Sequence, residues 1–141
     1  MKIHEFQAKQ VLSRYGVPVP RSKVAESVEE AVDAARELGG EVWVVKDQIH
    51  AGGRGKGTVI ETGSHGVVLA KGLDEVKGKA AGILGGHLVT AQTNAKGKQV
   101  NKVLIAEDEY CPGDSEPKEI YMSVLLDRAN CRNIVMYSPQ G

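Results

Sequence analysis

The residues best suited to chemistry in this 141-residue chain lie in one segment, VWVVKDQIHAGGRGKG. Its first four residues are β-branched or aromatic, a composition that predicts a short buried strand. Lys46 then stands at the end of that strand, where it is a well-placed positive charge. Gly53, Arg54 and Gly55 follow, and glycine lets backbone N–H groups approach a ligand closely while a guanidinium can hold phosphate oxygens in a bidentate fork. This combination suits a polyphosphate.

The segment does not fit either of the two commonest phosphate motifs. A Walker A loop needs glycine where His50 stands, and serine or threonine where Gly57 stands. The dinucleotide motif GxGxxG fails because Thr58 takes the place of its third glycine. From the residues alone, two interpretations therefore stay open: a loop that binds a phosphorylated ligand, and a flexible hairpin tip.

Other reactive side chains give weaker signals. The four histidines are far apart and form neither HxH nor HExxH, so no metal site is predicted. Cys111 and Cys131 carry no local signature of a nucleophile, and no residue is assigned a catalytic role. Glu107 ends an apolar run and Glu119 opens the next one. From their positions alone, both carboxylates are interpreted as solvated charges at strand ends.

Composition excludes several classes of partner. Eighteen basic residues balance eighteen acidic ones, so no global field attracts nucleic acid or an anionic membrane. No run approaches the ~18 apolar residues of a membrane span, and no signal peptide opens the chain. The two cysteines form no CxxC pair, and a reduced compartment is expected, the cytoplasm in preference to the mitochondrial matrix.

Periodicity predicts a fold that mixes helices and strands. Helical spacing indicates helices over residues 3–15, 28–38 and 73–83, the second of them begun by a capping box of Ser27 and Glu30. A short strand is expected within residues 18–25. Further apolar runs predict strands at residues 66–70, 120–126 and 134–138, and a hairpin formed by residues 87–92 with 100–106.

Four stretches together carry a family resemblance: MKIHEFQAKQVLSRYGVPVP, WVVKDQIHAGGRGKG, LVTAQT and IYMSVLLDRA. In this order they resemble the β subunit of succinyl-CoA synthetase, the ADP- or GDP-forming succinate–CoA ligase, over well under half of that subunit. The resemblance implies an ATP-grasp fold of α/β (α+β) class, in which two lobes clasp a nucleotide. The chain would supply the smaller lobe and the first strands of the second lobe.

The resemblance also assigns roles to individual residues. Lys46 would lie on the nucleotide phosphates, and Gly53, Arg54 and Gly55 would form the loop that covers them. Glu107 would lie at the strand beside the base, with a backbone contact of the family falling near Tyr110. Glu119 would face the ribose hydroxyls. These roles agree with the chemistry of the side chains, because cations suit anionic oxygens and carboxylates accept from hydroxyl groups.

The implied ligands are ATP/ADP or GTP/GDP, succinate and coenzyme A, with Mg²⁺ held by residues beyond Gly141. The implied partner is an α subunit that carries a phosphohistidine. The expected division is residues 1–20 packing with the second lobe, 21–112 as the smaller lobe, and 113–141 as the start of the second lobe, in a chain expected to continue. Two alternatives remain: a non-catalytic nucleotide- or anion-binding module, and a malate–CoA ligase or related ADP-forming acyl-CoA synthetase.

Overall fold

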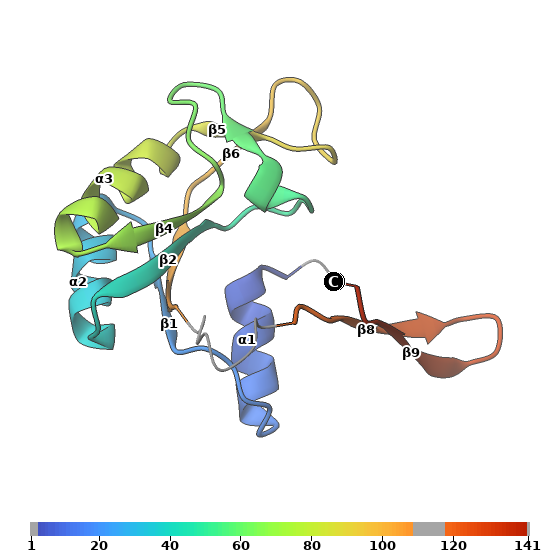
Figure 1. Cartoon of the computed structure of the whole chain (residues 1–141). Helices are drawn as coiled ribbons and strands as arrows, with labels where there is room; N and C mark the ends of the chain where they lie inside the picture. The colour runs from blue at the N-terminus through green and yellow to red at the C-terminus, as the bar shows by residue number, and fades with distance from the viewer. Residues whose placement is uncertain (1–2, 109–117, 141) are drawn as a thin grey trace. The chain divides into compact units, whose positions relative to one another are not determined.

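The computed structural model describes residues 3–108 and 118–140. It divides into two compact units, Met1–Asp108 and Glu109–Gly141. Among the described residues, the first unit holds three α-helices, one 3₁₀ turn and strands β1 to β7, and the second holds β8 and β9 (Figure 1). The predicted division at residues 20 and 112 stays a prediction.

The helices agree with the predicted ones to within two residues at each end. They are α1 (Glu5–Arg14), α2 (Val28–Leu38) and α3 (Leu73–Ile83), with a 3₁₀ turn, η1 (Arg54–Lys56). The strands of the first unit are β1 (Ser22–Ala25), β2 (Val42–Asp47), β3 (Thr58–Val59), β4 (Val67–Lys71), β5 (His87–Val89), β6 (Lys98–Gln99) and β7 (Val103–Glu107).

The main sheet has the strand order β1-β7-β2-β4, and all of its pairings are antiparallel. The predicted hairpin of residues 87–92 with 100–106 is wrong in its second arm, because β5 pairs with β6 and β3 while β7 joins the main sheet. The physical reason is burial: Val103–Ala106 are each at most 1% exposed, so this run is apolar on both faces and suits a central strand.

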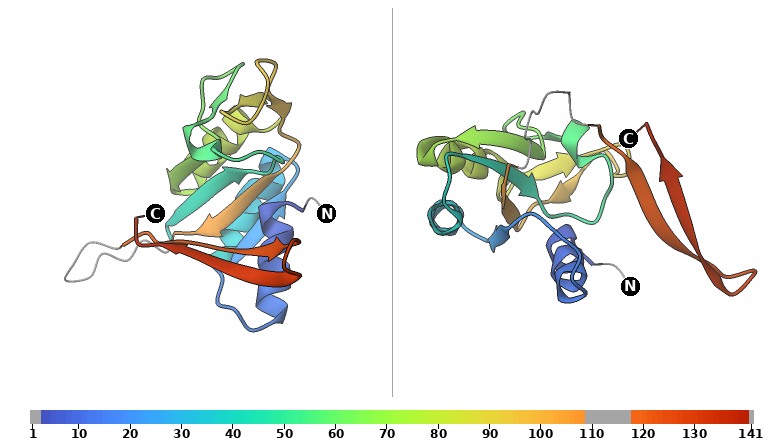
Figure 2. Two further views of the ribbon diagram at one scale, coloured as in Figure 1. Left: turned by 90° about the vertical axis from the view of Figure 1, so that its right-hand side faces the viewer. Right: turned by 60° about the horizontal axis from the view of Figure 1, so that its bottom comes forward.

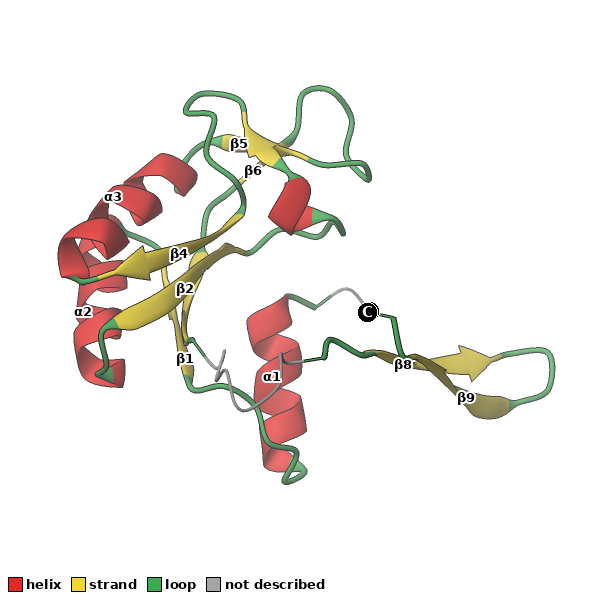
Figure 3. Ribbon diagram, in the orientation of Figure 1, coloured by secondary structure: helices red, strands yellow, loops and turns green. Residues whose placement is uncertain are grey.

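Helices α2 and α3 cover one face of the main sheet (Figure 3). Ser27 caps α2 as predicted, its hydroxyl accepting from Glu30 N at 3.1 Å. The Glu30 carboxylate differs from the predicted box, since it accepts from Glu26 N at 2.8 Å. The core between helices and sheet consists of small and β-branched residues, including Ala31, Ala35, Val45, Val76, Ala80, Ile83, Val103 and Ile105.

The other face of the sheet carries Lys46. Residues directly opposite one another on neighbouring strands point to the same face, and Lys46 pairs with Leu104, which in turn pairs with Val24. Leu104 is buried although it lies outside the core under α2 and α3. Helix α1 lies on this face, near β1 (Figure 1).

A second sheet of three short strands, in the order β3-β5-β6, lies beyond the end of β2 (Figure 2). Strand β3 was not predicted, because two residues are too short to show a period. Leu88 and Val59 are fully buried and pair across this sheet. The small sheet thereby supports the glycine-rich segment that leaves β2.

The second unit is an antiparallel hairpin of β8 (Tyr121–Asp127) and β9 (Arg132–Ser138), in register from Tyr121 with Ser138 to Asp127 with Arg132. These confirm the two predicted strands. Cys131, in the turn, has φ +49°, which is a left-handed conformation. All other described residues with a positive φ are glycines.

Candidate functional site

The glycine-rich segment after β2 is structured. Gly53 has φ +73°, which favours glycine, and its carbonyl accepts from Lys56 N at 3.2 Å to form the η1 turn. Gln92 Oε1 accepts from Gly52 N at 2.7 Å and joins the segment to the turn that follows β5. These hydrogen bonds give the segment a defined turn.

The structure brings Lys46 and Arg54 together on one carboxylate. Glu5, the first residue of α1, lies with Oε1 3.4 Å from Lys46 Nζ and pairs through Oε2 with Arg54 Nη2. The same carboxylate lies 3.1 Å from Lys9 Nζ. The three side chains Glu5, Lys46 and Arg54 are each about one-fifth to one-quarter exposed. Two of the residues predicted to bind phosphate are therefore neighbours, with a positively charged group on each side of Glu5.

Asp47, the last residue of β2, lies behind Arg54. Its side chain is fully buried, its Oδ2 accepts from Ile49 N at 3.2 Å, and its backbone carbonyl accepts from Arg54 Nη1. Its Oδ1 has no hydrogen-bond partner among the described residues. Burial raises the pKa of Asp47 to about 6, because the lost hydration outweighs the attraction of the Arg54 guanidinium.

Glu107, at the end of β7, is held by Arg21. The two side chains form an ion pair, Glu107 Oε2 accepts from Arg21 N at 3.2 Å, and Glu107 N donates to Arg21 O at 3.0 Å. Glu107 pairs with Trp43 on β2, three residues before Lys46, so the two positions lie about 10 Å apart along the strand. The structure thus separates Glu107 from the Lys46–Arg54 pair by most of the length of β2.

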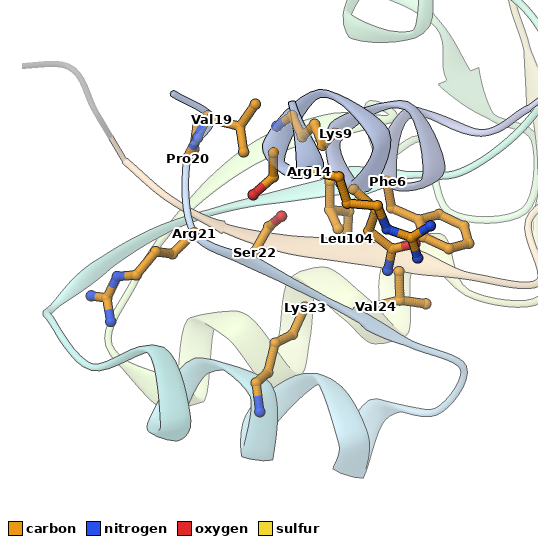
Figure 4. Close-up of a pocket in the computed structure, with 12 residues that line it drawn as sticks. Phe6, Lys9, Arg14, Val19, Pro20, Arg21, Ser22, Lys23, Val24 and Leu104 are labelled. Atoms are coloured by element: carbon orange, nitrogen blue, oxygen red, sulfur yellow. The ribbon is translucent and has the colours of Figure 1, made fainter. Parts of the chain in front are cut away.

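A cavity of about 720 Å³ lies between α1 and β1 (Figure 4). Ser22 and Val24 point toward α1, whereas Lys23 points to the other face, where it pairs with Glu37 of α2. The cavity reaches Arg21 but neither Lys46 nor Arg54 lines it. It therefore adjoins the Glu107 end of the sheet and not the glycine-rich segment.

The remaining predicted residues are not brought to this site. Tyr110 lies outside the described residues. Glu119 is exposed and belongs to the second unit, and its ribose-facing role stays a prediction. Within residues 3–108 and 118–140, no group of three histidine, cysteine, aspartate or glutamate side chains could hold a metal ion. No helix in the described part of the chain is long and apolar enough to cross a membrane.

Three residues near the site were missed by sequence reasoning: Glu5, Asp47 and Gln48. Glu5 gives no local signal, because its partners follow it by more than forty positions. Asp47 and Gln48 did carry one, since two polar residues directly after a buried strand must find polar partners if they are buried. Their burial, 0% and 3% exposed, shows that they do belong to the interior.

The buried carboxyl of Asp47 leads to a pH-dependent stability. Its pKa is higher in the folded chain than its ordinary value of 3.8, so the folded chain binds this proton more tightly. The free energy of unfolding should therefore fall as pH rises from about 4.5 to 6, by up to ~2 kcal/mol. Asp47→Asn should remove this fall, as measured by urea unfolding at a series of pH values.

The fall in the free energy of unfolding is measured only above pH 4.5, because below this pH the titration of Glu5 changes that free energy in the opposite direction. Burial opposes the ionisation of Glu5, but the hydrogen bond from Arg54 and the charges of Lys46 and Lys9 lower its pKa to about 2. Its stabilisation is lost as pH falls below 4.5. Asp33→Asn, an exposed aspartate on α2, is the matched control and should keep the wild-type slope. An equal slope in Asp47→Asn would contradict the assignment.

Comparison with known families identifies the class of protein. Residues 2–141 match the family described as the ATP-grasp domain, and the chain belongs to that family. Among curated proteins it is similar to succinate–CoA ligase [ADP-forming] subunit beta. It is 53% identical to that of Christiangramia forsetii and 51% identical to that of Cupriavidus taiwanensis, in each case over all of this chain. The chain spans about a third of these relatives, 35% and 33% of their lengths.

A solved structure shares the fold. It is an acetyl-coenzyme A synthetase of Ca. Korarchaeum cryptofilum, in complex with coenzyme A, acetyl-coenzyme A and a phosphorylated phosphohistidine segment. It matches with a TM-score of 0.63 and 26% identity, over 96% of this chain and 51% of that one. The ATP-grasp fold that the resemblance implied, with helices and strands mixed, is thereby confirmed.

Proposed function

We propose that this chain is the nucleotide-binding part of the β subunit of a succinate–CoA ligase. The complete enzyme would interconvert succinate, coenzyme A and a nucleoside triphosphate with succinyl-CoA, a nucleoside diphosphate and phosphate. The observation that carries the proposal is the pair Lys46 and Arg54 on one carboxylate, at the end of β2 and beside a glycine-rich turn. The similarity to ADP-forming succinate–CoA ligases supports it.

In this proposal Lys46 and Arg54 bind phosphate oxygens, and the backbone of Gly53–Gly55 covers them. Donors already held in place stabilise the charge of a transferring phosphoryl group without reorganising during the reaction. Glu107 and the backbone near Tyr110 would lie beside the base, and Glu119 would accept from the ribose hydroxyls. Glu107 pairs with Trp43, three residues before Lys46 on β2, so the side chains of Glu107 and Lys46 lie on opposite faces of the sheet. The role of Glu107 beside the base is therefore supported by the resemblance alone.

Mg²⁺ is assigned to residues outside this chain. The partner is an α subunit that carries the phosphohistidine. Succinate and coenzyme A would bind to parts of the complete enzyme other than this chain. The named relatives are bacterial proteins, which favours the bacterial cytoplasm as the compartment.

The test is turnover by the complete β subunit assembled with its α subunit. Thioester formation would be followed with ATP and with GTP, and with succinate and with malate as the acid. Succinyl-CoA formation with either nucleotide is the expected result. Turnover with malate but not succinate would make the chain part of a malate–CoA ligase. Nucleotide binding without turnover on any acid would identify a non-catalytic nucleotide-binding module.

A further inference from the structure

Glu5 makes contacts that its position in the sequence does not suggest. It is the first residue of α1, yet its two carboxylate oxygens reach the end of β2 and the η1 turn. Oε1 lies 3.4 Å from Lys46 Nζ, and Oε2 pairs with Arg54 Nη2. A single carboxylate therefore joins the two cationic side chains assigned to the phosphates.

Arg54 is held from two directions. Glu5 engages Nη2, while Nη1 donates to the backbone carbonyl of Asp47 and lies 3.9 Å from Asp47 Oδ2. An arginine guanidinium is planar and its donors point in fixed directions, so two acceptors on different nitrogens set the orientation of the plane. The rest of its edge is left to meet a ligand in one defined orientation.

The end of α1 that carries Glu5 is itself fixed to the segment after β2. Gln48, 3% exposed, accepts from Phe6 N at 3.2 Å and donates to the Asp47 carbonyl at 2.8 Å. The rings of His4 and His50 stack with their centroids 3.9 Å apart. A hydrogen bond and a ring contact thus join the backbone that carries Glu5 to the segment after β2.

The carboxylate has an electrostatic reason to be there. Two cations placed side by side repel each other, and an ionised carboxylate between them offsets this repulsion before any ligand binds. The neighbouring charges lower the pKa of Glu5 to about 2, against the effect of burial, so the group stays ionised at neutral pH. Holding both side chains in advance also removes the entropy cost of ordering them when a ligand arrives.

We propose that Glu5 is a positioning residue, whose carboxylate holds Lys46 and Arg54 side by side in the orientation that binds the polyphosphate of a nucleotide. This inference rests on the proposed function, because it takes Lys46 and Arg54 as the phosphate-binding residues. It assigns Glu5 no contact with the nucleotide itself. A carboxylate that competed with phosphate for the same two cations would have the opposite effect on affinity.

The test is titration of the complete β subunit, in complex with its α subunit, with ADP and Mg²⁺. Glu5→Ala removes the acceptor and should raise the ADP Kd about tenfold. Glu5→Gln keeps an amide oxygen that can accept from Arg54 but removes the charge, and should raise Kd about threefold. The graded order, wild type then glutamine then alanine, is a result that general destabilisation would not produce. Glu29→Gln, which alters a first-turn acid of α2, is the control and should leave Kd unchanged.

The outcomes separate this inference from the function on which it rests. If the wild-type complex binds no nucleotide, the proposed function fails and the role of Glu5 falls with it. If wild type binds and both Glu5 variants bind equally well, the function stands and the positioning role is overturned, even where the variants melt at lower temperature. Tighter binding in Glu5→Ala also overturns it, because that result would make Glu5 a competitor of phosphate.

Discussion

Arg54→Ala is expected to lower kcat/KM for the nucleotide about 100- to 1,000-fold in the proposed complete ligase, which corresponds to ~3–4 kcal/mol of transition-state stabilisation. The guanidinium is already oriented by Glu5 and Asp47, so its removal takes away donors that need no reorganisation. Lys46→Ala should have an effect of the same order, because Lys46 is the penultimate residue of β2, a strand that is paired on both sides. Initial rates at varied nucleotide concentration measure both.

Arg54→Lys sharpens this prediction because it retains the charge. An ammonium group cannot engage Glu5 and the Asp47 carbonyl on separate nitrogens, so most of the loss should remain. Arg36→Ala, which removes an exposed arginine that pairs with Asp33 on α2, is the control and should stay within twofold of wild type. Near-normal rates in both Arg54→Ala and Lys46→Ala would remove these residues from the phosphate site.

Gly66→Ala is expected to destabilise the first unit by about 3 kcal/mol. A Cβ at this position would lie 2.7 Å from Asp47 Oδ1, 2.7 Å from Leu88 Cδ2 and 2.8 Å from the Arg54 carbonyl oxygen. Asp47 and Leu88 are fully buried, and the third atom belongs to the backbone, so none of them can move aside cheaply. Urea unfolding should show a lower midpoint with an unchanged slope.

Gly78→Ala is the matched control for this substitution. Gly78 lies within α3, and a Cβ there would meet nothing within 4 Å. The same chemical change should therefore stabilise the chain by ~0.5–1 kcal/mol, since alanine loses less conformational freedom than glycine in a helix. If Gly66→Ala proved as stable as wild type, the close packing of Asp47, Leu88 and the Arg54 backbone would be contradicted.

Much of the fold could be predicted because its signals are local. The signals that predict α2, the capping Ser27 and the apolar stripe after it, lie within or directly beside that helix. The β-branched run at the start of β2 likewise predicts a strand by itself. The pairing of strand β7 could not be predicted from sequence, because the composition of an apolar run does not indicate which strands lie beside it in the sheet. The nearest preceding strand signal was β5, yet β7 pairs with β1, which lies roughly 80 residues earlier.

The candidate site was predictable to a lesser extent, and for a related reason. Lys46 and Arg54 stand next to glycines and a strand end, so their residue types and spacing are informative by themselves. What fixes them is not nearby in sequence: Glu5 is contributed by α1, and Asp47 gains its character from burial. Side chains that position other side chains follow tertiary contacts, and these have no period or motif in the chain.

The position of β7 between β1 and β2 also bears on how the chain folds during synthesis. Both neighbours are made first, and neither can pair with β7 until residues 103–107 have left the ribosome. At the usual ~5–20 residues per second, β1 would wait about 4–16 s for its partner. During that interval its backbone groups are an open edge, so the short length of β1, four residues with a lysine among them, limits the risk of pairing with another nascent chain.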